Sequence, residues 1–359
     1  MIVQERFFDW TWTTPGKHSR GLNGMFGSYE PRSYIPVIAD CLQKRFPGED
    51  RMPSLPRCHI VPMAGHQVAF MIGEREVLRW HAGTDYPRPY FFPLLSPSGA
   101  MLTRMGHPGA PDHDHHQSVW FAHNKVLGID FWGNASGATI RQLQWFAYDD
   151  AEDSCRMAVE LGWFDGHNPE PLIRQELCCE LRPYGDHGEY TLELQSTFVP
   201  VAASLELGKT NFGFLAIRVA KSVSAVFGAG VLTGSDGQQK EPNLFGKPNT
   251  WMDYSGPTRW GDERIEGITY FDHPKNPGQP TGWHVRDDGW MCASPCMNAP
   301  ITLTKEAPLT LRYLLHVHRG AVEASRAAEI LSSFAGTWPM KVVKGDIPHI
   351  RSTVVRLTW

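Results

Sequence analysis

The chain has 359 residues, of which 42% are hydrophobic, and a formal net charge of -4. This length allows a large buried core, and the lack of a basic stripe argues against a nucleic-acid partner. No window approaches the roughly 18 consecutive apolar residues of a membrane helix, and the N-terminus lacks the pattern of an export signal. We therefore expect a cytoplasmic protein with no membrane partner.

The seven cysteines are scattered, and none forms a paired CxxC zinc pattern. An odd number of cysteines in a large chain without an export signal is typical of reduced thiols. We expect most of them to be buried as small apolar side chains.

Along the chain, an aperiodic start gives way to short apolar or alternating runs. Residues 1–32 show no clear period, and residues 34–46 are compatible with one short helix. From residue 57 onward the runs have the length and alternation of β-strands. In the run 190–198, the pattern predicts one dry face, with Tyr190 and Leu192, and one wet face, with Glu193 and Gln195.

The second half continues the series of strands and adds one helix. Residues 228–248 are rich in Gly, Pro and Asn and are expected to form a loop, whereas residues 321–336 have helical periodicity and end at Gly336. Many strands with one late helix predict an all-β fold, a large antiparallel β-sandwich. We assign it to residues 61–359, with residues 1–60 as an N-terminal extension.

Five histidines fall within seventeen residues, at positions 107, 113, 115, 116 and 123. In an extended segment His113 and His115 share a face, and His116 points away. This pair could bind a divalent metal if a third ligand came from elsewhere in the chain. Without a metal, the same imidazoles could act as general acid and base near neutral pH. Structural histidines in a solvated loop are the alternative.

Thirteen tryptophans form a second signal, because an aromatic face can stack on the C–H face of a sugar ring. Most of these rings are expected in the core. Trp120, near His123, and Trp283, near Arg286, are the predicted pocket residues.

Polar residues at other places in the chain are further candidates. A Pro-fixed turn at 272–277 contains His273, and the next strand contains Arg286. Glu176 and Arg218 are charges inside strand-like runs, so they face solvent or meet in a pocket. Asp253 lies at the end of a strand-like run, where its carboxylate could act as a base or could form a turn. The motifs of serine hydrolases, Rossmann dehydrogenases, P-loop enzymes and HExxH zinc enzymes are absent.

Several stretches resemble a known bacterial family, the one labelled "methane oxygenase PmoA-like". They are RPYFFPLLSPSG (88–99), the histidine segment 106–132, GFLAIRVA (213–220), WMDYSG (251–256) and residues 271–289, so the resemblance spans about residues 85–318. It implies a galactose mutarotase-like β-sandwich that binds a sugar in an open cleft, with a histidine and a carboxylate as acid and base. The histidine segment, Asp253, His273 and Arg286 match that cleft by position.

One departure concerns the base. Where the family often has a Lys-Glu pair, this chain has Asn211-Phe212. The role of that glutamate is therefore lost, moved to Glu176 or Asp253, or replaced by other chemistry.

The expected function is that of an enzyme that cleaves or epimerises a sugar or keto-sugar glycoside. A non-catalytic carbohydrate-binding protein is the alternative, and copper-dependent oxidation is the least favoured. A carbohydrate is the expected partner; a divalent metal at His113 and His115 and a homo-oligomer are left open. The predicted catalytic residues are His113, His115, Asp253 and Glu176, and the predicted substrate-binding residues are His116, Trp120, His123, Asn211, Arg218, His273, Trp283 and Arg286.

Overall fold

The computed structural model describes residues 55–259, 261 and 263–357. The predicted extension, apart from its last six residues, and the helix expected at 34–46 lie outside the described residues. Within the described part, no helix is long and apolar enough to cross a bilayer.

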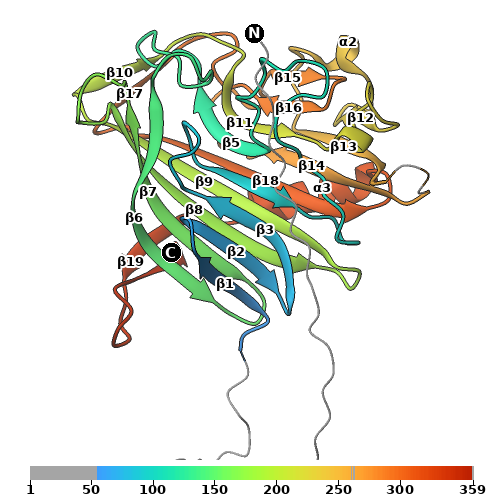
Figure 1. Cartoon of the computed structure of the whole chain (residues 1–359), viewed down its shortest axis with the longest axis horizontal. Helices are drawn as coiled ribbons and strands as arrows, with labels where there is room; N and C mark the ends of the chain where they lie inside the picture. Colours follow the sequence, from blue (N-terminus) through green and yellow to red (C-terminus); the bar gives the residue numbers. More distant parts are fainter. Residues whose placement is uncertain (1–54, 260, 262, 358–359) are drawn as a thin grey trace, which may run out of the picture. The chain divides into compact units, whose positions relative to one another are not determined.

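The described residues form two eight-stranded antiparallel sheets that enclose a common core (Figure 1). The prediction of a large antiparallel β-sandwich is thereby confirmed. The first sheet has the strand order β1-β2-β3-β4-β5-β11-β16-β15, and the second has the order β12-β13-β14-β18-β9-β8-β7-β6. The strands of the first sheet are β1 (Cys58–Met63), β2 (Gln67–Ile72), β3 (Arg75–His81), β4 (Tyr90–Leu94), β5 (Val119–His123), β11 (Gly213–Arg218), β16 (Trp290–Ala293) and β15 (Trp283–Arg286). Those of the second are β12 (Val231–Gly234), β13 (Trp251–Pro257), β14 (Ile265–Asp272), β18 (Leu309–Arg319), β9 (Glu189–Pro200), β8 (Ile173–Tyr184), β7 (Cys155–Phe164) and β6 (Thr139–Asp150).

Smaller elements complete the described fold. Two further strand pairs are β10 (Ser204–Leu207) with β17 (Ile301–Thr304), and β19 (Met340–Lys344) with β20 (Ser352–Arg356). Helix α3 (Ala324–Ala335) confirms the helix expected at 321–336. The segment 228–248, expected to be a loop, instead contains β12 and the short helix α2 (Glu241–Leu244).

Alternation along each strand divides the residues between the shared core and an outer face. In β5, Val119 and Phe121 belong to the core, and Trp120 lies on the outer face of the first sheet. In β18, Leu315 and Val317 belong to the core, and His316 lies on the outer face of the second sheet. The two outer faces therefore lie on opposite sides of the core.

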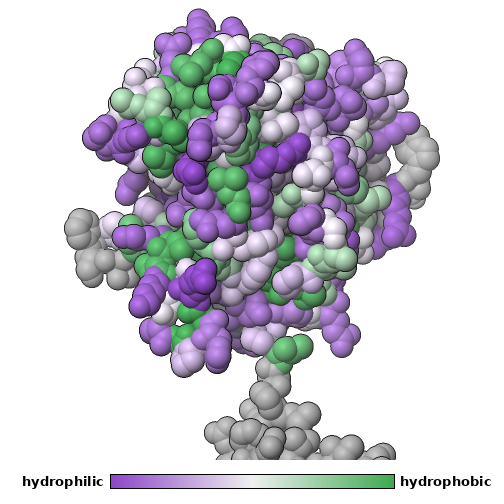
Figure 2. Space-filling model, turned by 60° about the vertical axis from the view of Figure 1, so that its left-hand side comes forward, coloured by the Kyte–Doolittle hydropathy of each residue, from purple (hydrophilic) through white to green (hydrophobic). Residues whose placement is uncertain are grey.

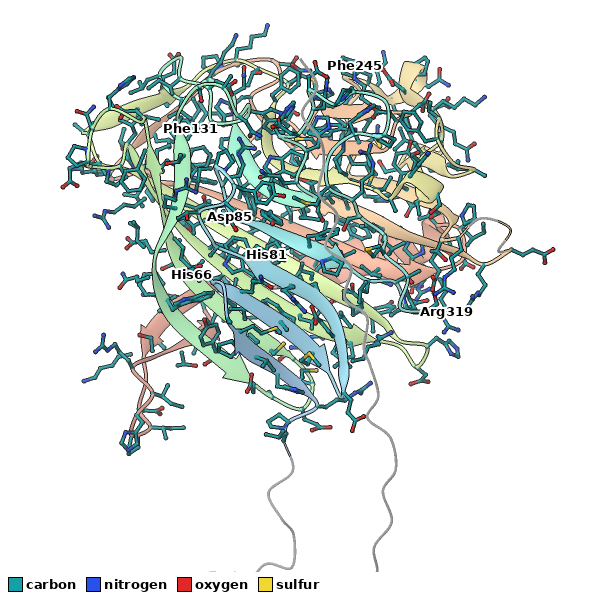
Figure 3. The ribbon with its side chains drawn as sticks, in the orientation of Figure 1. His66, His81, Asp85, Phe131, Phe245 and Arg319 are labelled. Carbon is teal, nitrogen blue, oxygen red and sulfur yellow. The ribbon has the colours of Figure 1, made fainter. Side chains whose placement is uncertain are left out.

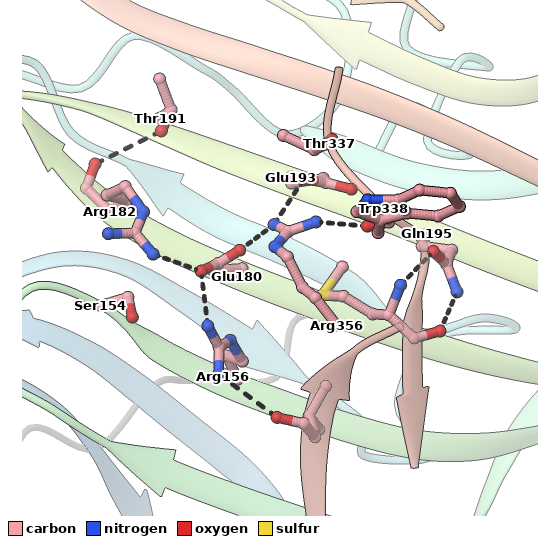
Figure 4. Close-up of polar contacts among 12 residues, drawn as sticks. Ser154, Arg156, Glu180, Arg182, Thr191, Glu193, Gln195, Thr337, Trp338 and Arg356 are labelled. Carbon is pink, nitrogen blue, oxygen red and sulfur yellow. Dashed lines mark hydrogen bonds and ion pairs between the residues drawn. The ribbon is translucent and has the colours of Figure 1, made fainter. Parts of the chain in front are cut away.

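The outer face of the second sheet is polar but buried, which corrects the expectation that Glu193 and Gln195 face water. The Gln195 side chain binds the backbone of Met340, with its Nε2 donating to the carbonyl at 2.7 Å and its Oε1 accepting from the amide at 2.8 Å. Glu193 and Glu180 accept hydrogen bonds from Arg356 (Figure 4). The C-terminal pair β19–β20 thus covers a face that alternation alone would assign to solvent.

At the surface, hydrophobic residues occur in separate patches among polar ones on the face shown in Figure 2. The cysteines within the described ranges are all buried and free, as expected: Cys58, Cys155, Cys178, Cys179, Cys292 and Cys296.

Candidate functional site

A cavity of about 170 Å³ opens on the outer face of the first sheet. The loop before β5 contributes its histidines, and β11, β15 and β16 contribute the strand residues. We call it the first cavity; its lining residues are His113, His115, His116, Phe212, Arg218, His284, Arg286, Asp288 and Trp290. Register explains why the strands meet there, because Arg218 is opposite Trp290, and Trp290 is opposite Arg286.

A buried ion pair forms one wall of the first cavity. The guanidinium of Arg218, only 2% exposed, donates from Nη1 to Asp288 Oδ1 at 2.6 Å and from Nη2 to Oδ2 at 3.2 Å. His107 Nε2 also lies 2.8 Å from Asp288 Oδ2. Burial opposes ionisation of Asp288, but the bonds from Arg218 and His107 outweigh it and lower the pKa of this carboxyl. Asp288 is therefore an anion whose oxygens are already engaged.

His116 is held as a neutral hydrogen-bond donor. Nε and Nη2 of Arg218 donate to its Nδ1 at 3.1 and 3.0 Å, so the proton of the neutral ring is on Nε2. Burial, followed by the positive charge of Arg218, lowers the pKa of His116. The ring thus presents an N–H group without a positive charge.

His284 has the opposite tautomer. Its Nδ1 donates to the carbonyl of Asn211 at 3.1 Å, which leaves the lone pair on Nε2. Burial, followed by Arg286, lowers the pKa of His284 to about 3. Phe212 and Phe245 contact this imidazole edge-on, at 4.8 and 5.4 Å between ring centroids. His284 therefore supplies an acceptor framed by aromatic rings.

His113 and His115 lie at the mouth of the first cavity, with ring centroids 5.4 Å apart. His113 Nδ1 is 2.9 Å from Asp112 Oδ1, so in the neutral ring this carboxylate accepts the Nδ1 proton and the lone pair is on Nε2. The His113 side chain is 42% exposed. Burial, followed by His113 and Arg88, lowers the pKa of His115 to about 4.

Tryptophan rings form the floor. Trp120, Trp132 and Trp290 pack against one another with centroids 5.3 to 5.6 Å apart. Arg218 stacks on Trp290 at 4.8 Å, and the indole Nε1 of each of the three tryptophans is buried without a hydrogen-bond partner. The floor is thus a packed aromatic layer, and Trp290 is the member that lines the cavity.

Over the described residues, no group of three or more His, Cys, Asp or Glu side chains is arranged to hold a metal ion. Among the residues that the structure describes, His113 and His115 therefore have no third ligand. The divalent metal considered from the sequence gains no support from the arrangement of these side chains.

Five of the predicted residues meet at the first cavity: His113, His115, His116, Arg218 and Arg286. Trp120 belongs to its floor, against Trp290. Asn211 contributes its main-chain carbonyl, which accepts from His284 and from Ser294 Oγ.

The structure places the other predicted residues elsewhere. Trp283 is a core residue whose Nε1 donates to the carbonyl of Asn249, and His123 is buried against Phe214 with Nε2 bonded to Gly208 O. Asp253, Glu176 and His273 belong to the second sheet or the turn after it. Asp253 binds His318, Glu176 lies beside Cys178, and His273 is bonded to Arg312. No carboxylate opposite His113 comes from Asp253 or Glu176, because the shared core separates them from the first cavity.

Sequence reasoning missed Phe212 and Asp288, and it noted His107 and His284 without choosing them as site residues. Strand alternation could have identified His284. Since Trp283 and Val285 face the core, His284 and Arg286 must share the outer face. Asp288 follows in the turn between β15 and β16, and its pairing with Arg218 depends on a contact across 70 residues.

A family model described as "Family of unknown function (DUF6807)" matches residues 67–332. The comparisons give no support to the PmoA-like label. A comparison with curated proteins gives no match.

Solved structures give weak likenesses. A candidate aldose 1-epimerase from Escherichia coli K12 has 11% identity and a TM-score of 0.29, covering 73% of this chain and 99% of its own. A candidate mutarotase from Salmonella typhimurium has 10% identity and a TM-score of 0.29, covering 79% and 100%. A 4-alpha-glucanotransferase from Thermococcus litoralis has 9% identity and a TM-score of 0.27, covering 74% and 40%. Similarity at this level carries no statement about substrate or reaction.

Proposed function

The chain belongs to the family of unknown function DUF6807, and for this member we propose that the first cavity binds a keto-sugar glycoside and cleaves it by acid–base chemistry. The observation that carries this proposal is the convergence of neutral imidazoles with opposite tautomers on one aromatic floor. His116 offers an N–H donor and His284 offers a lone pair, 5.2 and 5.5 Å from Trp290 between ring centroids. Hydroxyl and carbonyl groups on a ring need that combination.

The size of the cavity fits a small ligand. Its volume of about 170 Å³ is below the roughly 300–1,000 Å³ of pockets for drug-sized molecules. One sugar ring suits such a space, with its C–H groups against the part of Trp290 that lines the cavity and the aglycone directed outward past Phe212.

The charges argue against hydrolysis by two carboxylates, which most glycosidases use. Of the described residues that line the first cavity, only Asp288 is acidic, and Arg218 and His107 already engage it. A substrate activated by its own ketone avoids this requirement, because a C–H bond next to a carbonyl is acidic enough for an imidazole to act as base.

The proposed reaction is an elimination. His113 Nε2 takes the proton from the carbon between the ketone and the anomeric carbon, and the electron pair moves onto the carbonyl oxygen. The Nε2–H of His116 stabilises that oxyanion. The enolate then expels the aglycone from the anomeric carbon, and the protonated His113 returns its proton to the leaving oxygen.

An assay with a pair of nitrophenyl glucosides tests this function. One is unmodified, and in the other the hydroxyl two carbons from the anomeric centre is oxidised to a ketone. We expect the wild-type protein to release nitrophenol from the keto form and not from the parent, as followed by absorbance. Release from both at equal rates, or from neither, would refute the elimination.

The alternative is a cavity that binds sugars without catalysis, and the engagement of Asp288 is the observation that favours it. Calorimetric binding of the keto-glycoside without release of nitrophenol would support this alternative.

A further inference from the structure

A second cavity, of about 230 Å³, lies on the outer face of the second sheet. It is formed by strands β14 and β18, the turn after β18 and the first turn of α3. Its lining residues are Thr269, His316, His318, Arg319, Gly320, Ala321, Val322, Glu323, Arg326 and Ala327. Figure 3 labels Phe245, beside the first cavity, and Arg319, at the second, and the two lie well apart.

The two buried carboxylates under this second cavity are saturated by donors. Asp253 accepts from Ser255 Oγ at 2.5 Å, Thr269 Oγ1 at 2.9 Å and His318 Nε2 at 2.8 Å. Glu189 accepts from His316 Nε2 at 3.2 Å, from the Arg319 amide and from the guanidinium of Arg326. Their negative charges are therefore compensated within the protein.

The two histidines differ in protonation. His318 faces acceptors on both nitrogens, Asp253 Oδ2 and the carbonyl of Arg319, so both nitrogens carry protons. Burial opposes this charge, but Asp253 outweighs it and raises the pKa of His318. In His316 burial prevails over Glu189 and lowers the pKa, so the ring is neutral, with its proton on Nε2.

His316 therefore has a lone pair on Nδ1, and this atom has no hydrogen-bond partner among the described residues. The side chain is 4% exposed and lines the second cavity. An acceptor without a partner at a cavity wall is open to a hydroxyl of a ligand or to water.

Groups that attract anions also line the second cavity. Helix α3 begins at Ala324 beside the second cavity, and its N-cap residue Glu323 makes no side-chain cap, so the positive end of the helix dipole is not capped by a side chain. The exposed guanidinium of Arg319 makes no ion pair with the residues described. The second cavity thus combines an acceptor, His316 Nδ1, with groups of positive potential.

We propose that the second cavity binds a small hydroxycarboxylate such as a sugar acid. Its carboxylate binds the first turn of α3 and Arg319, and one of its hydroxyls donates to His316 Nδ1. This site does not depend on the function proposed for the first cavity, because the two are on opposite sides of the core.

Calorimetric titrations of the full chain with three six-carbon probes separate the contribution of the carboxylate to the affinity from that of the hydroxyls. Gluconate has both groups, hexanoate lacks the hydroxyls, and glucitol lacks the carboxylate. We expect gluconate to bind at least tenfold more tightly than either of the others, since hydrogen bonds to charged groups contribute most. Equal affinities for gluconate and hexanoate would contradict the role of His316, and equal affinities for gluconate and glucitol would contradict the anion site.

Substitutions at exposed residues show which cavity binds gluconate and do not disturb the core. Arg319→Gln is expected to weaken gluconate binding about tenfold, and Glu323→Gln to strengthen it, because a carboxylate beside the site is removed. His284→Gln in the first cavity serves as the matched control and should leave gluconate binding unchanged. If His284→Gln weakens binding and Arg319→Gln does not, gluconate binds in the first cavity and the proposal is wrong.

Discussion

The His113→Gln variant is expected to release nitrophenol from the keto-glycoside about 10²–10⁴ times more slowly than the wild type, which is the usual contribution of one general acid–base group. Glutamine keeps a polar side chain at the mouth of the cavity but cannot take up a proton. Because the proposed binding contacts come from Trp290, His116 and His284, KM should change much less than kcat. Steady-state kinetics of the release measure both constants.

Two further variants test whether His113 acts as the base. Asp112→Asn should lower kcat less than His113→Gln, since it removes only the acceptor that orients Nδ1. The exposed His167, far from the cavity in the sequence and bonded through its amide to Asp165, is the control, and His167→Gln should match the wild type. A His113→Gln variant with unchanged kcat would remove His113 from the mechanism.

Between pH 6.5 and about 4, the free energy of unfolding of the wild type is expected to fall by about 3 kcal/mol more than that of His123→Gln. Burial lowers the pKa of His123 to about 4, only partly opposed by its bond to Gly208, and the unfolded chain has the ordinary value of 6.5. In this pH range the unfolded state binds a proton that the folded state does not. Stability from this group is therefore full above pH 6.5 and is lost as the pH falls toward 4.

Urea unfolding at several pH values measures this difference. The titration of the carboxylates is common to both proteins and cancels in the comparison. His187, which is exposed in a turn, provides the control, and His187→Gln should follow the wild-type curve. Parallel curves for His123→Gln and the wild type would mean that His123 does not contribute to the acid sensitivity.

The packing around His123 shows why it is not part of the site, although the sequence predicted that it was. It belongs to the histidine segment, but strand alternation places it on the same face as Val119 and Phe121, which face the core. A Cβ at Gly213 would lie 2.3 Å from its Nδ1, so the opposite strand makes room for the ring with a glycine. Counting alternate positions from Trp120 would have excluded His123.

The strands and the late helix were predictable because alternation and helical periodicity are local. The polar outer face of the second sheet was not, since Gln195 is buried by Met340 from a strand pair 145 residues later. Contacts between residues far apart in the sequence also limited the prediction of the site. The histidine segment was recognised from its composition, whereas the pairing of Arg218 with Asp288 depends on how β11 and β16 are joined in one sheet.

In the proposed complex a sugar ring binds against Trp290 between His116 and His284. A crystal structure of His113→Gln soaked with the keto-glycoside tests it most directly, because this variant should bind the substrate without consuming it. We expect the ring against Trp290, with the ketone oxygen within about 3 Å of His116 Nε2. A ligand bound at any other place, with the first cavity empty under saturating conditions, would contradict the account.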